Sequence, residues 1–153
     1  MDPFVRRFIR ASLLWLGVGV LIGVAMAVHP AAAAFRTAHM HANLLGFVSM
    51  MIFGVAYHVI PRFVGRPLHS RRAAALHLWV ANAGLAAMVG GFVLRVYRWE
   101  AGMPVLGAGA VLSATGAMLF IHNIWRTLDA ARASPGAASE GRTPIIPLTR
   151  NAR

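Results

Sequence analysis

The sequence predicts an all-α integral membrane protein, folded as an up-down bundle of four helices. The chain has 153 residues, of which 58% are hydrophobic and only 12% are charged. This composition is too apolar for a soluble domain of this length. Four segments reach the roughly 20 apolar residues that a membrane-spanning helix needs. Because the connections between these segments are short, we expect sequential helices to run antiparallel.

The first expected span covers residues 8–28 and follows Arg6 and Arg7, a basic start that secretory signals share. Its apolar run is longer than that of a usual signal peptide, so we expect a retained helix. The second span covers residues 39–60.

The third expected span, residues 73–94, lies between arginines on both sides. The fourth, residues 103–125, carries Ala110 and Ala114 at helical spacing, and such small residues let membrane helices approach closely. We interpret residues 1–131 as one membrane domain. Residues 132–153 shift in composition to Ser, Pro, Gly, Ala and Arg, and we expect them to form a disordered cytoplasmic tail.

The distribution of charge predicts the orientation in the membrane. All 15 basic residues are arginines, and the net charge is +11. Twelve of them lie at the amino end of the chain, follow the fourth span, or lie between the second and third spans. The other three are Arg36, Arg95 and Arg98. Because positive residues stay inside, both termini are expected in the cytoplasm. The charge is therefore interpreted as contact with the lipid bilayer, and no nucleic acid is expected as a partner.

The sequence lacks the residues for cysteine-based sites and for a carboxylate relay within the membrane. The chain has no cysteine, which excludes disulfides, iron–sulfur clusters and thiolate zinc sites. It has four carboxylates, and none falls within an expected span. A carboxylate proton relay through the membrane is therefore excluded as well.

The pair His39 and His41 opens the second span and is the strongest candidate for a functional site. Ionisable side chains at membrane depth are costly, and imidazole is a common ligand of metals and haem iron. Residues two apart on a helix differ by about 200°, so the pair is expected to serve two separate sites. Asn43 adjoins the pair, and His29 lies at the same membrane face.

Three arginines are expected at the same depth as this pair, namely Arg36, Arg95 and Arg98. Guanidinium groups bind carboxylates through two parallel hydrogen bonds, and a haem carries two propionates. Imidazoles with arginines at one depth are therefore typical of a haem environment.

Three further histidines, His58, His77 and His122, are expected at the opposite membrane face. Three imidazoles at one depth suit a copper or zinc site. Each also lies near a helix end, where an imidazole finds backbone carbonyls or interfacial water. Both interpretations stay open.

The residues around the histidine pair resemble subunit I of the haem-copper oxidases. In that family a late transmembrane helix opens with Ala-His-x-His and closes in an aromatic-rich stretch before a proline. Here Ala38-His39-Met40-His41 opens the segment, and the run from Gly54 to Phe63 closes it. The following stretch, Leu76 to Gly84, is similar to the next helix of the family, particularly in its C-type, cytochrome cbb branch.

The resemblance implies roles for the two histidines. His39 matches the proximal ligand of the high-spin, oxygen-reducing haem, and His41 matches one of two ligands of the low-spin haem. Arg95 and Arg98 lie where several relatives place arginines that bind propionates. The chain holds only the equivalent of the last four helices, so it cannot be a complete terminal oxidase by itself. A second copy, a partner subunit or His29 would have to complete the ligation.

Two functions are consistent with these observations. The first is a haem b protein of the bacterial inner membrane, acting in electron transfer from a periplasmic donor or in binding O2 or NO. His41 would hold its iron, with His39 holding a second haem or copper, and the chain would form a homo-oligomer or join a partner subunit. The alternative is a copper-binding or assembly protein using His29, His39 and His41, or an accessory subunit of a respiratory complex without haem.

Overall fold

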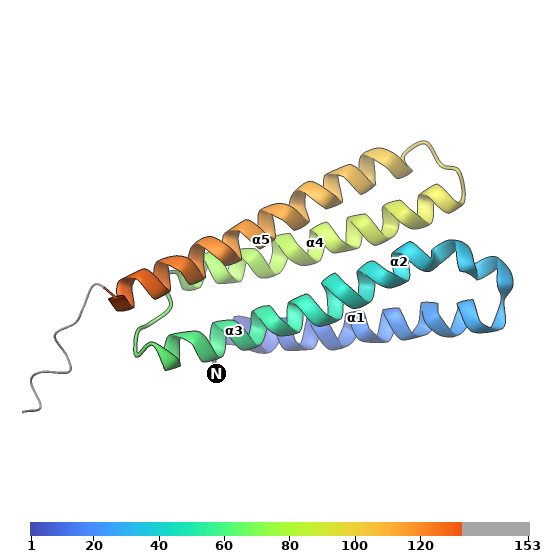
Figure 1. Cartoon of the computed structure of the whole chain (residues 1–153). Helices are drawn as coiled ribbons and strands as arrows, with labels where there is room; N and C mark the ends of the chain where they lie inside the picture. The colour runs from blue at the N-terminus through green and yellow to red at the C-terminus, as the bar shows by residue number, and fades with distance from the viewer. Residues whose placement is uncertain (133–153) are drawn as a thin grey trace, which may run out of the picture.

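The computed structural model describes residues 1–132, and helices joined by short loops make up this part of the chain (Figure 1). Four of its helical rods are long and apolar enough to cross a membrane, which confirms the expected number of spans. The elements are α1 (Pro3–Val28), η1 (Pro30–Phe35), α2 (Arg36–His41), η2 (Ala42–Ser49), α3 (Met50–Phe63), α4 (Arg71–Val96) and α5 (Gly102–Arg132). The expected tail lies outside the described residues, apart from Arg132, which is the last residue of α5.

The second span differs from its prediction at its end, at its start and in its middle. It ends at Phe63, so Pro61 lies inside the helix rather than after it. It begins at Pro30 rather than His39, because a proline with its fixed φ suits the first turn of a helix. Its middle section, η2, is a π-helix, a wider turn that is rare in long runs and frequent at functional sites. The Ser49 hydroxyl donates to the Leu44 carbonyl across this widened turn at 2.9 Å. The π-helix follows directly after His41.

The four rods are arranged as two antiparallel hairpins laid side by side (Figure 1). α1 packs along η2 and α3, whereas α5 packs mainly against α4. Glycines permit the close approach of α4 and α5. A Cβ on Gly84 would lie 2.6 Å from the backbone nitrogen of Ser113, and one on Gly109 would lie 2.5 Å from that of Met88. Small residues therefore let these two backbones nearly touch.

The loop between α3 and α4 is held against α5 by hydrogen bonds. Ser70 caps α4 by accepting from the backbone N–H of Ala73 at 3.1 Å. Asn123 of α5 binds both backbone groups of Ser70, accepting from its N–H at 2.9 Å and donating to its carbonyl at 2.8 Å. These two hydrogen bonds hold the start of α4 against α5.

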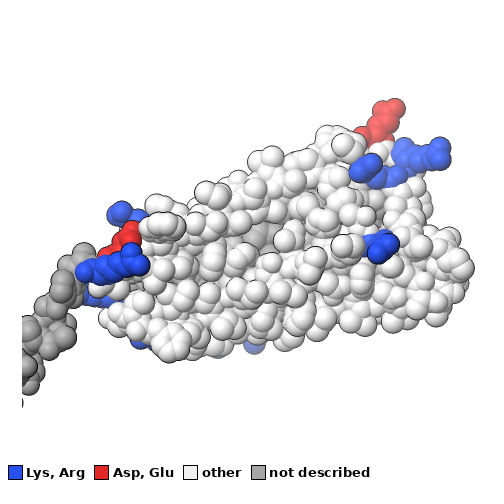
Figure 2. Space-filling view, viewed as in Figure 1, with Lys and Arg blue, Asp and Glu red and all other residues white. Residues whose placement is uncertain are grey.

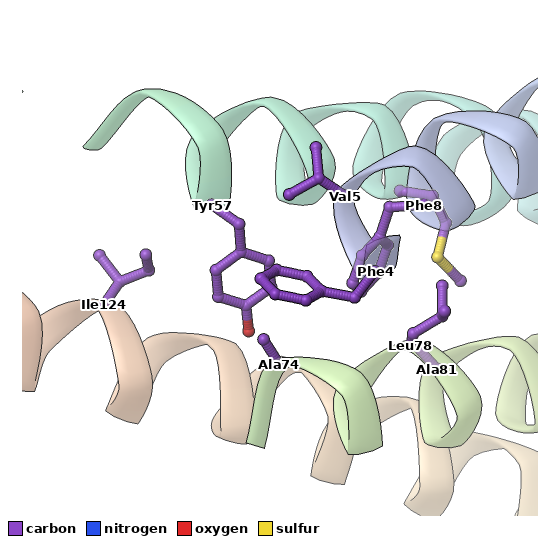
Figure 3. Close-up of a cluster of buried hydrophobic side chains, with 9 residues drawn as sticks. Phe4, Val5, Phe8, Tyr57, Ala74, Leu78, Ala81 and Ile124 are labelled. Carbon is purple, nitrogen blue, oxygen red and sulfur yellow. The ribbon is translucent and has the colours of Figure 1, made fainter. Parts of the chain in front are cut away.

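The hydrophobic core lies at the end of the molecule where α1 begins and α5 ends (Figure 3). Phe4 and Phe8 of α1 pack against Tyr57 of α3, each with ring centroids 5.8 Å from the tyrosine ring. His77 of α4 is fully buried beside them, and its Nδ1 lies 3.1 Å from the Tyr57 hydroxyl. His77 is thus a packed core residue.

Charged side chains gather toward the two ends of the molecule, with a nearly uncharged middle between them (Figure 2). This is the pattern of a multi-pass membrane protein, since charges are costly in the hydrocarbon layer. One ion pair occurs within residues 1–132 and joins Arg71 to Asp2 at 2.6 Å.

Candidate functional site

His39 lies on α2 and faces α1. Its Nδ1 is 2.9 Å from the carbonyl oxygen of Gly19, and because a carbonyl only accepts, this nitrogen carries the proton. A Cβ on Gly23 would lie 3.0 Å from Cε1 of the same imidazole. Two glycines of α1, one turn apart, therefore form the recess that receives the ring.

Asn43 shares this recess with His39. Its side-chain amide donates to the His39 carbonyl at 2.9 Å, and the same nitrogen lies 3.3 Å from Nε2 of the imidazole. A Cβ on Gly19 would lie 2.5 Å from the Asn43 side-chain oxygen. α1 and Asn43 together occupy the space around the His39 ring.

His41 faces α4 instead, in agreement with the expected separation of the two imidazoles. Its ring packs on Phe92 with centroids 4.8 Å apart. Its Nδ1 lies 2.9 Å from the Thr37 carbonyl one helical turn earlier, so this nitrogen is also the protonated one. Within residues 1–132 no hydrogen bond engages Nε2 of His41. The basic nitrogen of this imidazole is thus left for an external ligand.

A surface hollow of about 370 Å³ lies between the start of the second span and the end of α4, and His41 itself does not line it. Thr37, Phe92 and Arg95 line it, the same threonine and phenylalanine that hold the His41 ring. The hollow therefore combines an apolar wall with a guanidinium.

The other two expected arginines are exposed near this end of the molecule. Arg36 is the first residue of α2, and Arg98 lies in the turn that reverses the chain between α4 and α5. Arg98 has a φ of 58°, the left-handed conformation that such a tight reversal uses. Of the three arginines, the structure brings only Arg95 to the wall of the hollow.

The histidines do not assemble into a metal-binding cluster. His29 is exposed at the end of α1, while His39 faces α1 and His41 faces α4. Within the described residues, no group of three or more His, Cys, Asp or Glu side chains could hold a metal ion. The ligand set expected for copper is therefore not brought together here.

The same holds for the three histidines at the other end. His58 lies 3.0 Å through Nδ1 from Arg62, whereas His77 is buried in the core. His122 is exposed and faces His69, with ring centroids 6.0 Å apart. The structure thus favours the interpretation that these histidines make local contacts.

Three contributions to the site escaped the sequence analysis. The Thr37 carbonyl is one turn from His41 and is predictable from helical spacing alone. Phe92 and the Gly19–Gly23 recess lie on other helices, and no local signal indicates which helix will face which histidine.

Comparison with known proteins identifies the family. The family described as Cytochrome C and Quinol oxidase polypeptide I matches residues 4–146. The chain belongs to this family. It is 27% identical to the Cbb3-type cytochrome c oxidase subunit CcoN1 of Stutzerimonas stutzeri over 161 residues, covering 86% of this chain and 34% of that protein.

Two other relatives agree. Identity is 25% to cytochrome c oxidase subunit 1 of Rhodobacter capsulatus, covering 83% of this chain and 29% of that protein. It is 23% to the cytochrome c oxidase subunit 1 homolog of Agrobacterium tumefaciens (strain T37), covering 95% of this chain and 32% of that protein. The chain thus spans about a third of the length of these relatives. The resemblance to subunit I of the haem-copper oxidases is confirmed, and the family is one of membrane-bound, haem-type electron-transfer proteins.

Proposed function

We propose that this protein binds haem b in the membrane and acts in electron transfer or in the binding of O2 or NO. The observation that carries the proposal is the imidazole of His41. Its Nδ1 is held by the Thr37 carbonyl at 2.9 Å, which leaves Nε2 as the basic nitrogen. Thr37 and Phe92, the two residues that contact this imidazole, also line an open hollow. A second hydrogen bond of this kind orients metal-bound histidines and raises their basicity.

The residues around His41 fit a haem in their chemistry. A porphyrin supplies four nitrogens, so the protein has to provide only axial ligands, and a cluster of three side chains is not required. Phe92 supplies an apolar wall and fixes the plane of the His41 ring. Arg95 offers the two-pronged donor that suits a propionate. The haem, when bound, supplies the redox or gas-binding chemistry.

His39 fits a separate haem less well. The recess between α1 and α2 is already filled by the imidazole and by Asn43, whose amide nitrogen lies 3.3 Å from Nε2. A ligand at this nitrogen requires Asn43 to move. We therefore assign the iron to His41 and give His39 the role of joining α2 to α1.

A single His41 leaves a six-coordinate haem short of one ligand. Symmetric association supplies the same residue from a second copy, which makes a homo-oligomer the simplest arrangement. A partner subunit that provides the second ligand is the other candidate. We place the protein in the bacterial inner membrane with its arginine-rich end in the cytoplasm.

The first test is an absorption spectrum of the protein purified in detergent, oxidised and then reduced with dithionite. A Soret band with sharp reduced α and β bands is expected of a six-coordinate haem b. A shift on adding carbon monoxide would reveal an open position for O2 or NO. Protein expressed with ample haem that lacks any Soret band would contradict the proposal.

A further inference from the structure

A groove runs along the outer face of the molecule between α1 and α4, near the end where α1 begins. It comprises two adjoining hollows of about 520 and 280 Å³, which share Ala11, Leu14 and Asn82. Arg7 and Arg10 line the end nearest the start of α1, and Val18 lines the other end.

The interior of the groove is apolar. Leu14 and Trp79 form its sides and are 73% and 65% exposed, so large hydrophobic surfaces face outward there. The polar groups of Asn82 are already satisfied, because its oxygen accepts from the Trp15 indole at 3.0 Å and its amide donates to the Leu78 carbonyl at 2.7 Å. A ligand in the groove therefore meets hydrocarbon rather than unpaired polar atoms.

The length of the groove matches one leaflet of a bilayer. Arg7 and Val18 are eleven residues apart on α1, which corresponds to about 16 Å along the helix. Half of a hydrocarbon core about 30 Å thick is about 15 Å. A lipid chain anchored beside the arginines would reach the far end of the groove near the bilayer midplane.

Positive charge marks only one end of the groove. Arg7 and Arg10 are three residues apart, so they share one face of α1, and both are exposed. No carboxylate lines the groove, and Asp2 is already paired with Arg71. Arginine at such a position binds phosphate through paired hydrogen bonds while its alkyl stem lies along apolar surface.

From this arrangement we propose that the groove binds one anionic phospholipid. Its phosphodiester lies between Arg7 and Arg10, and one acyl chain lies over Leu14 toward Val18. A second copy of the chain is a poorer occupant, because this end of the molecule carries many more arginines than carboxylates, as Figure 2 illustrates for one face. The acidic headgroup supplies the negative charge that another copy lacks. This site is independent of haem.

The proposal is tested by native mass spectrometry of the detergent-purified full chain titrated with phosphatidylglycerol or phosphatidylcholine. The wild type is expected to retain phosphatidylglycerol preferentially. The double variant Arg7→Gln/Arg10→Gln should weaken this binding about thirtyfold, and its matched control, Arg66→Gln/Arg126→Gln, should leave it unchanged. Ala11→Phe fills the groove without altering charge and should also abolish retention, whereas Ala27→Phe on the same helix should not.

Three results would overturn the proposal. These are equal retention of both lipids by the wild type, equal losses in the double variant and its control, and full retention in Ala11→Phe. A photoreactive amino acid in place of Leu14 provides a second test, which detects the bound molecule directly by cross-linking. A cross-link from this photoreactive residue to phospholipid is expected, and a cross-link to a second copy or to another protein would show that the groove is a protein interface.

Discussion

At the scale of the residue, His39 and His41 are distinguished by what surrounds their second ring nitrogen. Both imidazoles hold Nδ1 on a backbone carbonyl at 2.9 Å. Asn43 approaches Nε2 of His39, whereas His41 packs on Phe92, which also lines a hollow. The two histidines of this motif are thus expected to have different roles. Single substitutions distinguish these roles.

His41→Ala is expected to abolish the six-coordinate haem spectrum, because it removes the proposed axial nitrogen. His39→Ala should retain that spectrum, since its ring contacts α1 instead. His122→Ala, an exposed histidine at the opposite end, is the control for a general loss of imidazole. Absorption spectra of the reduced proteins provide the measurement. A haem lost from the His39 variant and kept in the His41 variant would reverse our assignment.

Gly19→Ala is expected to displace Asn43 and break its hydrogen bond to the His39 carbonyl, because the new Cβ would lie 2.5 Å from the asparagine side chain. A cost of about 1 kcal/mol in unfolding free energy is expected from the lost bond. Gly17→Ala adds the same methyl group where nothing lies within 4 Å. Denaturant unfolding in detergent compares the two, and equal stabilities would show that the recess accommodates the methyl group.

At the scale of the element, the contact between α4 and α5 depends on glycine more than on any hydrophobic side chain. The two backbones approach so closely that a Cβ on Gly91 would lie 2.7 Å from the backbone nitrogen of Leu106. Backbone atoms cannot rotate away as a side-chain end can. An added methyl group here must separate the helices.

Gly109→Ala is therefore expected to destabilise the second hairpin by about 1–3 kcal/mol, the cost of overpacking a tight interface. Its Cβ would meet the Met88 backbone nitrogen at 2.5 Å. Gly107→Ala lies two residues away on the same helix and meets nothing within 4 Å, so its stability should not fall. Unfolding midpoints measured side by side provide the test. A destabilised Gly107 variant would point instead to an interface on the outer face of α5.

At the scale of the whole molecule, the core and the candidate site lie at opposite ends of the helices. The aromatic core begins at Phe4, whereas the His39 ring meets Gly19, fifteen residues and about 23 Å further along α1. The core residues and the candidate site residues are therefore separate sets of contacts. Two copies that share one haem would meet at the histidine end, away from the aromatic core.

If two copies each supply His41 to one iron, the protein should contain one haem for every two chains. Pyridine haemochrome absorbance divided by protein concentration measures this ratio. Multi-angle light scattering on the same sample should then find haem in the dimer or a higher oligomer. One haem per chain in a monomeric species would contradict shared ligation and require a second ligand within the same chain.

Much of the architecture follows from composition and spacing alone. Four apolar segments separated by short arginine-bearing connections can only be buried in a bilayer, so the number of spans and their alternation were predictable. The separation of His39 from His41 also followed, because it depends only on the rotation per residue in a helix. Both are local or additive properties of the chain.

The remaining features depend on which helices meet, and this only the tertiary structure decided. The start of the second span at Pro30 and the π-helix after His41 are details of backbone geometry that hydropathy does not carry. Three contacts join residues that are far apart in sequence. His41 packs on Phe92, His39 contacts Gly19 and Gly23, and His77 is buried against Tyr57. Local patterns specify that a helix forms, but the fit of side chains between helices selects its neighbours.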